Sequence, residues 1–429
     1  MNPTALAAGI LPLAIFPENG LAHSALPPIF VGLILITFFA EAYGWVYTGL
    51  IIPGYMAPVW IVHPWAGCVV VFECVLTYLI VRAMSDHLSR LGLWDDFFGR
   101  DRFFAMVLVS IGVRLICEAW FFPIVGEAAV RTFGVTFDYH NRLHSVGFVV
   151  VPLLANVFWK PGLRRGFLPA AFLMTATYLV VRYVLIPYTN YSVARFDLLY
   201  EDVARGLDSG PKVYIVLVVG AWMASRVNLK YGWDMGGILV PTLLMLAWTT
   251  PTKIVATAGE ATLVAAVARY ILGSRFLEST TIEGPRRTLL VFSVGMVIKF
   301  IVGHMTAIPG LGFKATDMYG FGYMLPTLLA DKILTKNSLG IVLIPVLRTS
   351  LIGFAIANGV GYGLYVASDY LATSAATHDD APHIEVRDAP LADVLTLDRA
   401  RILPAEARNT YDTPLARELS GFRQAFATI

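Results

Sequence analysis

The sequence predicts an all-α, polytopic integral membrane protein built from two parallel tandem repeats, with short helices that glycine and proline break. Hydrophobic residues make up 57% of the 429 residues and charged residues only 14%, and the mean hydropathy is +0.67. A soluble domain needs a more highly charged surface than this. A long internal repeat and a set of apolar stretches of membrane-spanning length complete the prediction.

The repeat is clearest in one phrase, which returns 188 residues later. Tyr43-Gly44-Trp45-x-x-x-Gly49-Leu50-Ile51-Ile52-Pro53 becomes Tyr231-Gly232-Trp233-x-x-x-Gly237-Ile238-Leu239-Val240-Pro241. Four charged residues recur in the same order, Glu73, Arg82, Arg102 and Arg114 as Glu260, Arg269, Arg287 and Lys299. Later, the stretch Pro152 to Asn156 corresponds to Pro326 to Asp331. The chain is therefore a tandem duplicate.

Five regions follow from the repeat and from the changes in composition. They are an N-terminal apolar segment at 1–27, a first membrane repeat at 28–188, a polar linker at 189–211, a second membrane repeat at 212–371 and a polar C-terminal tail at 372–429. The N-terminal segment lacks the basic residues that precede the apolar region of a signal peptide. We expect it to remain as an interfacial or partly inserted segment.

Eight apolar stretches have the length that a transmembrane helix needs, about 17 to 25 residues. They lie at 28–46, 64–84, 103–122, 166–187, 212–228, 252–272, 288–304 and 339–371. Each repeat also has two shorter apolar segments, at 49–62, 145–159, 236–248 and 319–334. The residues that mark these segments are Gly49, Pro53, Gly54, Tyr55, Pro152 and Asn156 in the first repeat and Gly237, Pro241, Pro326 and Asp331 in the second.

The shorter segments predict broken or re-entrant helices. A break leaves backbone polar groups that lipid cannot satisfy, so such segments should be enclosed by protein or line a polar cavity. Paired segments of this kind at corresponding places in two repeats mark the binding or translocation site of transporter-like folds. Plain kinked helices used for close packing are the alternative.

Basic residues indicate an orientation. Arg82, Arg102, Arg269 and Arg287 can all lie on one side if the short segments cross, and that side should be cytoplasmic. Each repeat makes an even number of crossings whether the short segments cross or turn back, so the repeats should be parallel rather than inverted.

Two carboxylates lie where a membrane protein should avoid charge. Glu73 and Glu260 fall near the middle of their spans, where a charge costs about 2.5 to 3.5 kcal/mol and needs a partner. We expect Arg114 to pair with Glu73, and Lys299 with Glu260, because both basic residues lie mid-span in the next helix.

Two roles are open for these pairs. They can border a passage for an anionic chain, or they can be structural ion pairs that fix the register of the helices. Arg182 and Arg348, in the last span of each repeat, would add positive potential to a conducting interior.

Motifs for nucleotide, dinucleotide, zinc-protease and serine-hydrolase chemistry are absent from the sequence. We therefore expect no catalytic residues, no cofactor and no metal. The net charge of +2, without a dense basic run, argues against nucleic acid as a partner.

The first repeat contains three distinctive stretches. They are Phe39-Ala40-Glu41-x-x-Gly44-x-Val46-x-x-Gly49-Leu50-x-x-Pro53-Gly54-Tyr55, then Arg102-x-x-x-Ala105-Met106, and Pro152 to Asn156. With these stretches, the first repeat resembles the poly-gamma-glutamate biosynthesis membrane proteins of the PgsC/CapC family. The second repeat resembles the family more weakly, because Leu229 stands where the first repeat has Glu41, Thr242 where it has Gly54 and Leu243 where it has Tyr55.

The resemblance implies a small multi-pass subunit of a capsule or polymer synthase in the bacterial cytoplasmic (inner) membrane. Its implied partners are a cytoplasmic, Mur-ligase-like amide ligase that uses ATP, an extracytoplasmic accessory protein and membrane lipid. Such a subunit would anchor the ligase or guide the anionic polymer across the membrane. It would itself be non-catalytic, since the ligase would form the gamma-glutamyl bonds. A secondary transporter for a small anion is the alternative, and a membrane-embedded enzyme that uses Glu41 or Glu73 is a further one.

Overall fold

The computed structural model describes residues 12–17, 21–45, 49–92, 99–133, 147–193, 212–232, 237–275, 282–306 and 324–378. Outside these ranges lie residues 1–11 and 18–20 of the predicted N-terminal segment, 194–211 of the predicted linker and 379–429 of the predicted tail, together with the gaps within the two repeats. Residues 145–146, 236 and 319–323 of the predicted short segments also lie outside the described residues.

The described residues form helices, with one isolated bridge between Leu13 and Thr189. The first repeat holds α2 (Leu26–Tyr43), α3 (Ile52–Val62), α4 (Pro64–Arg90), α5 (Gly99–Ile116), the π-helical turn η2 (Cys117–Phe121), α6 (Phe122–Phe133), α7 (Gly147–Val157), α8 (Leu163–Val180), the π-helical turn η4 (Val181–Leu185) and α9 (Ile186–Tyr188). The second repeat holds α11 (Lys212–Tyr231), α12 (Leu239–Ala247), α13 (Pro251–Leu272), α14 (Pro285–Thr306), α16 (Leu325–Lys336) and α17 (Leu339–His378).

Seven helical segments within the described ranges are long and apolar enough to cross a membrane. The protein is therefore a multi-pass, all-α membrane protein, as the composition predicts. The eighth expected span, 212–228, forms α11, in which the apolar stretch Tyr214–Val227 is shorter than the other seven. Helix α17 continues to His378, beyond the predicted start of the tail at 372.

Proline and glycine set the ends of these helices. Pro64, Pro251 and Pro285 are the first residues of α4, α13 and α14, a position that lacks an intrahelical N–H partner in any case. Gly44 ends α2 in the left-handed conformation at φ 65°, and its N–H donates to the carbonyl of Ala40. Gly232, its counterpart in the repeat, follows α11 at φ 61°. The repeated phrase therefore encodes a helix end that glycine adopts at least cost.

Helices α2 and α3 cross at two glycines. A Cβ atom on Gly54 would lie 2.2 Å from the Cα atom of Ile29, and one on Gly32 would lie 3.0 Å from the backbone nitrogen of Gly54. The second repeat crosses α11 and α12 at the equivalent place, where a Cβ atom on Gly220 would overlap Thr242. Small residues allow such close approach between membrane helices.

The two repeats pack against each other through a pair of reciprocal seams. In one seam, Phe103 and Val107 of α5 form a buried cluster with Leu217 and Ala221 of α11. In the other, helix α2 packs against α14.

The second seam uses the equivalent positions. Ile29 and Leu33 of α2, the counterparts of Leu217 and Ala221, share a buried cluster with Phe292 of α14, the counterpart of Val107. The same contact therefore forms twice, with the two repeats exchanging roles, and such an interface has two-fold symmetry. The repeats are thus related by an approximate two-fold axis.

Contacts at the ends of the helices show in which direction each repeat runs. Tyr191, which follows α9, donates a hydrogen bond from its hydroxyl to the carbonyl of Ser24 at 3.2 Å, so this segment ends where α2 begins. The continuous span from Leu163 to Tyr188 starts shortly after α7 ends. The start of α2 and the end of α7 therefore lie at opposite ends of the bundle.

Helices α5 and α14 begin at the same end of the bundle. Arg102 at the start of α5 contacts Asn156 near the end of α7, so α5 begins where α2 ends. Glu41 at that end of α2 pairs with Arg286 at the start of α14. The repeats are therefore parallel, as predicted from the number of crossings.

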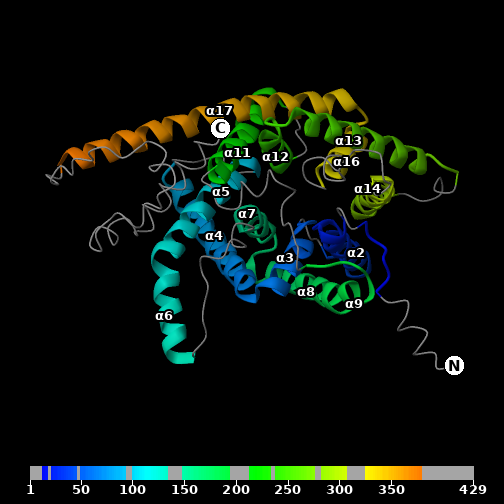
Figure 1. Cartoon of the computed structure of the whole chain (residues 1–429), viewed down its shortest axis with the longest axis horizontal. Coiled ribbons are helices and arrows are strands. Elements are labelled where there is room, and N and C mark those ends of the chain that lie inside the picture. Colours follow the sequence, from blue (N-terminus) through cyan, green and yellow to red (C-terminus); the bar gives the residue numbers. More distant parts are fainter. Residues whose placement is uncertain are drawn as a thin grey trace, which may run out of the picture.

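Figure 1 shows the resulting layers, with first-repeat helices α2, α3, α4 and α8 below and second-repeat helices α11, α13 and α16 above. Helix α17 runs along the top of the view, and α6 projects at the lower left. The short helices α3, α7, α12 and α16 are largely buried. Protein therefore encloses them. Backbone polar groups that a helix break leaves without partners are kept away from lipid in this way.

The crossing of α2 and α3 generates a stability prediction. Gly54→Ala should destabilise the protein by about 1 to 3 kcal/mol, since the added methyl group meets the backbone of Ile29. Gly112→Ala is the matched control, because a Cβ atom there meets nothing within 4 Å. Thermal unfolding in detergent measures both, and equal unfolding temperatures for the two variants would contradict the crossing.

Candidate functional site

The first repeat holds a three-residue charge cluster between α4 and the α5–η2 segment, with two of its members buried. Arg114 lies 3.6 Å from Glu73 and 2.5 Å from Glu118, measured between guanidinium nitrogen and carboxylate oxygen. The Arg114 and Glu73 side chains are 5% and 1% exposed, so the pairing expected from the sequence forms deep inside the repeat. Glu118 belongs to the π-helical turn η2 and completes the cluster.

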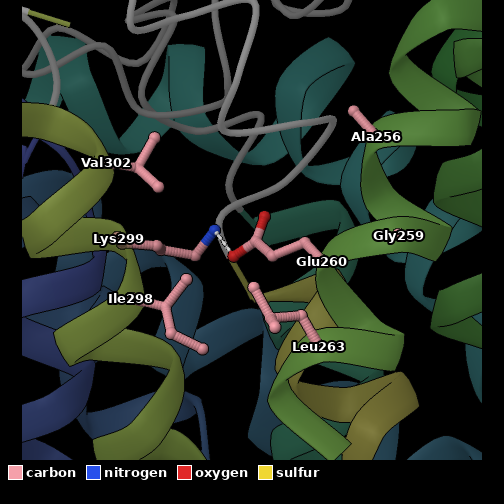
Figure 2. A pocket seen from close by; sticks show the side chains of 7 residues that line it. All are labelled: Ala256, Gly259, Glu260, Leu263, Ile298, Lys299 and Val302. Atoms are coloured by element: carbon pink, nitrogen blue, oxygen red, sulfur yellow. Dashed lines mark ion pairs between the residues drawn. The ribbon is translucent and has the colours of Figure 1, made fainter. Parts of the chain in front are cut away.

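The second repeat holds the equivalent pair between α13 and α14. The ammonium group of Lys299 pairs with Oε1 of Glu260, and the two side chains are 1% and 11% exposed. Figure 2 shows both side chains pointing toward each other from the two helices. Here too the predicted partners meet, and Gly303 stands where the first repeat has Glu118.

A second pair of equivalent contacts joins the short helices to the starts of the long ones. Arg102 donates to Oδ1 of Asn156 at 3.0 Å. In the second repeat, Arg287 lies 3.4 Å from Oδ1 of Asp331 and donates to Thr335 at 2.8 Å. Each arginine therefore holds the end of a short helix, α7 or α16, against the end of its repeat.

The remaining two predicted basic residues lie at the same ends. The guanidinium of Arg82 lies 5.3 Å from the ring centre of Trp159, and that of Arg102 lies 4.9 Å from the same ring, within the range of a cation–π interaction. Arg269 donates to Asn337 just after α16. Because the repeats are parallel, Arg82, Arg102, Arg269 and Arg287 share one end of the bundle, which we call the arginine end.

Arg182 and Arg348 do not lie in the interior, which corrects the expectation that they line a conducting path. Both are exposed on the surface of the chain. The faces of their helices that pack inward carry other residues, Val181 beside Arg182 and Thr349 and Ser350 beside Arg348, all fully buried. Helix rotation therefore turns the two arginines away from the bundle.

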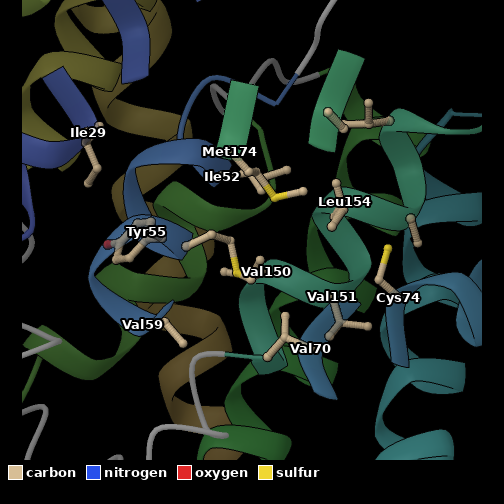
Figure 3. Close-up of a cluster of buried hydrophobic side chains, with 14 of the residues drawn as sticks. Ile29, Ile52, Tyr55, Val59, Val70, Cys74, Val150, Val151, Leu154 and Met174 are labelled. Carbon is tan, nitrogen blue, oxygen red and sulfur yellow. The ribbon is translucent and has the colours of Figure 1, made fainter. Parts of the chain in front are cut away.

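The motif residues of the short helices lie mainly in apolar cores. Pro53, Gly54, Tyr55 and Pro152 are buried in the first repeat, as is Gly49 just before α3. Figure 3 shows Tyr55 and Val59 of α3 on one side of this cluster, Val150 of α7 in the middle, and Leu154 of α7 farther across, toward Cys74. Pro241 and Pro326 are buried in the second repeat, whereas Gly237 is exposed with φ 106°.

Sequence reasoning missed three groups. Glu118 follows Arg114 by four residues, and this spacing indicates a pair on one helix face. The contacts of Arg102 with Asn156 and of Arg287 with Asp331 were detectable in principle, since both partners recur at equivalent positions of the repeat. The pairing of Glu41 with Arg286 across the repeats had no comparable signal, because Leu229 replaces Glu41 in the second repeat.

Comparisons with known proteins match both repeats. A family model described as "Capsule biosynthesis CapC" matches residues 31–167 and 219–342. The "PGA biosynthesis protein CapC" of Bacillus subtilis (strain 168) is 28% identical over 153 residues, which cover 36% of this chain and 90% of that protein. No solved structure matches the chain. The two matched segments make up more than half of the chain, so it belongs to the CapC family of capsule biosynthesis proteins, as a tandem duplicate.

Proposed function

We propose that this chain is the membrane subunit of a complex that makes and exports a poly-gamma-glutamate-type polymer. Its role in that complex is to hold a cytoplasmic, ATP-dependent amide ligase at the arginine end, so that the anionic product forms beside the membrane. The family match in both repeats is the observation that carries this proposal. An extracytoplasmic accessory protein would act on the other side of the inner membrane.

The geometry of the arginine end supports this role. Arg82 and Arg269 occupy equivalent positions near the ends of α4 and α13, and both side chains are exposed. An excess of arginine is typical of the cytoplasmic side of a membrane protein. Two equivalent basic sites on one face offer a ligase, or its polyanionic product, two attachment points with the same chemistry.

The buried ion pairs support an anchor more than a passage. Glu73 and Arg114 join two helices of the same repeat and are nearly inaccessible. A buried pair of this kind fixes the register of antiparallel helices, although it contributes little net stability over apolar residues of the same size. In this account the pairs hold the scaffold that presents the arginine end.

The arginine end generates the first functional prediction. In cells that carry the partner ligase, Arg82→Glu combined with Arg269→Glu should lower the membrane-bound fraction of ligase roughly tenfold, because reversed charges repel a complementary surface. The control is Arg131→Glu on α6, which removes an exposed arginine with an i,i+4 partner, Glu127, at the far end of the α5–α6 segment. Membrane fractionation with quantitative blotting gives the result.

Two outcomes would contradict the anchor. One is equal loss of ligase from the membrane in the control and in the double variant. The other is uptake or efflux of a small anion by the purified chain alone in proteoliposomes, which is the behaviour of a secondary transporter.

The ion pair in the first repeat generates a separate prediction. Arg114→Met should destabilise the protein by about 3 to 5 kcal/mol, since it leaves the Glu73 carboxylate buried without its cation. Glu73→Leu combined with Arg114→Met should recover most of this loss and keep polymer secretion. Unfolding in detergent and secreted polymer are measured together. A double variant that is stable but secretes no polymer would contradict the anchor and support a passage for the polymer at these ion pairs.

A further inference from the structure

The second repeat contains a pocket beside its buried ion pair. The pocket has a volume of about 300 Å³ and lies between α13 and α14. Figure 2 shows the side chains that surround it, with Glu260 and Lys299 at its centre. The remaining wall is apolar and consists of Ala256, Gly259, Leu263, Ile298 and Val302.

Comparison of the repeats explains why the space is open. Gly259 corresponds to Phe72 of the first repeat, where the ring stacks on Phe121 with centroids 5.4 Å apart. Ala256 corresponds to Val69, which is buried in a cluster with Phe122. A Cβ atom on Gly259 would meet nothing within 4 Å. Loss of one aromatic side chain therefore opens the wall beside the ion pair.

The pocket contains an unsatisfied hydrogen-bond acceptor. Oε1 of Glu260 pairs with Lys299, whereas Oε2 is buried and accepts no hydrogen bond from the described residues. A buried carboxylate oxygen without a donor is destabilising, because the hydrogen bonds that it made to water are not replaced. A ligand that donates an O–H or N–H group to this oxygen would replace one of them.

The surroundings restrict the ligand further. Leu263 lines the pocket and is half exposed on α13, a helix long and apolar enough to cross a membrane. A ligand that arrives from the bilayer needs an apolar chain to match the remaining wall.

We propose that this pocket is a binding site for a membrane amphiphile, namely an apolar chain that ends in a hydroxyl or amine donor, with the donor on Oε2 of Glu260. The proposal does not rest on the polymer function. In the first repeat, Phe72 stands at the position of Gly259.

Photolabelling of the full chain in detergent tests the site. The probe is a diazirine derivative of 1-octanol, and labelled peptides are mapped by mass spectrometry. Peptides of α13 and α14 should carry the label, and excess 1-octanol should compete for it. A diazirine octane without the hydroxyl should label these peptides roughly tenfold less, as loss of one hydrogen bond to a charged group implies.

Gly259→Phe supplies the decisive variant, because it restores the side chain that the first repeat has. It should reduce labelling of α13 and α14 roughly tenfold or more. Gly359→Phe is the control, since it places the same residue at an exposed glycine of α17 with open space around it, and it should label as the parent does. Matching unfolding temperatures of the two variants show that both are folded.

Three results would overturn the proposal. The first is unchanged labelling in Gly259→Phe, and the second is equal labelling by the octanol and octane probes. The third is competition by a gamma-linked glutamate oligomer but not by 1-octanol, which would assign the pocket to a segment of polymer.

Discussion

Two apolar seams between the repeats determine where the other helices can lie. Helix α5 packs on α11 and helix α14 packs on α2, through equivalent residues with the sides exchanged. A polar contact stands at the same end of each seam, Ser225 with Asp101 in one and Arg286 with Glu41 in the other. Because the seams are reciprocal, a feature that both repeats keep recurs across the same axis.

This arrangement explains why one end of the protein is rich in arginine. Each repeat holds its short helix, α7 or α16, through an arginine at the start of a preceding long helix, α5 or α14. The parallel seams then bring both sets to the same end of the bundle. A face with two equivalent basic sites is a consequence of the duplication.

The same symmetry shows where the repeats have diverged. In the first repeat, Phe72 next to Glu73 stacks on Phe121, and Glu73 belongs to a cluster of two carboxylates and one arginine. In the second, Gly259 leaves a pocket beside a single carboxylate and a lysine. The more open site therefore lies in the second repeat, which keeps fewer of the family residues than the first repeat does.

Much of the fold could be predicted from the sequence. Composition and repeat spacing indicate the class, the parallel duplication and the ion pairs of Glu73 and Glu260, because a mid-membrane carboxylate has few possible partners. The seams could not be predicted, since the side of a membrane helix that faces lipid is as apolar as the side that faces protein. The prediction that Arg182 and Arg348 lie in the interior was wrong for the same reason. Apolar residues lie on all sides of their helices, so the sequence does not show which face points inward.

Cysteine cross-linking of the two polar contacts at the seams tests the two-fold arrangement most directly. In a chain with Cys68, Cys74 and Cys117 replaced by serine, the pair Asp101→Cys with Ser225→Cys should form a disulfide on mild oxidation. The pair at the other seam, Glu41→Cys with Arg286→Cys, should be joined by a short bifunctional thiol reagent, since a contact between the tips of a glutamate and an arginine separates the Cα atoms by more than a disulfide spans. Each cross-link should hold the two repeats together after protease cleavage in a linker engineered between them. Cross-linking of only one pair, or of neither, would contradict the reciprocal packing of the repeats.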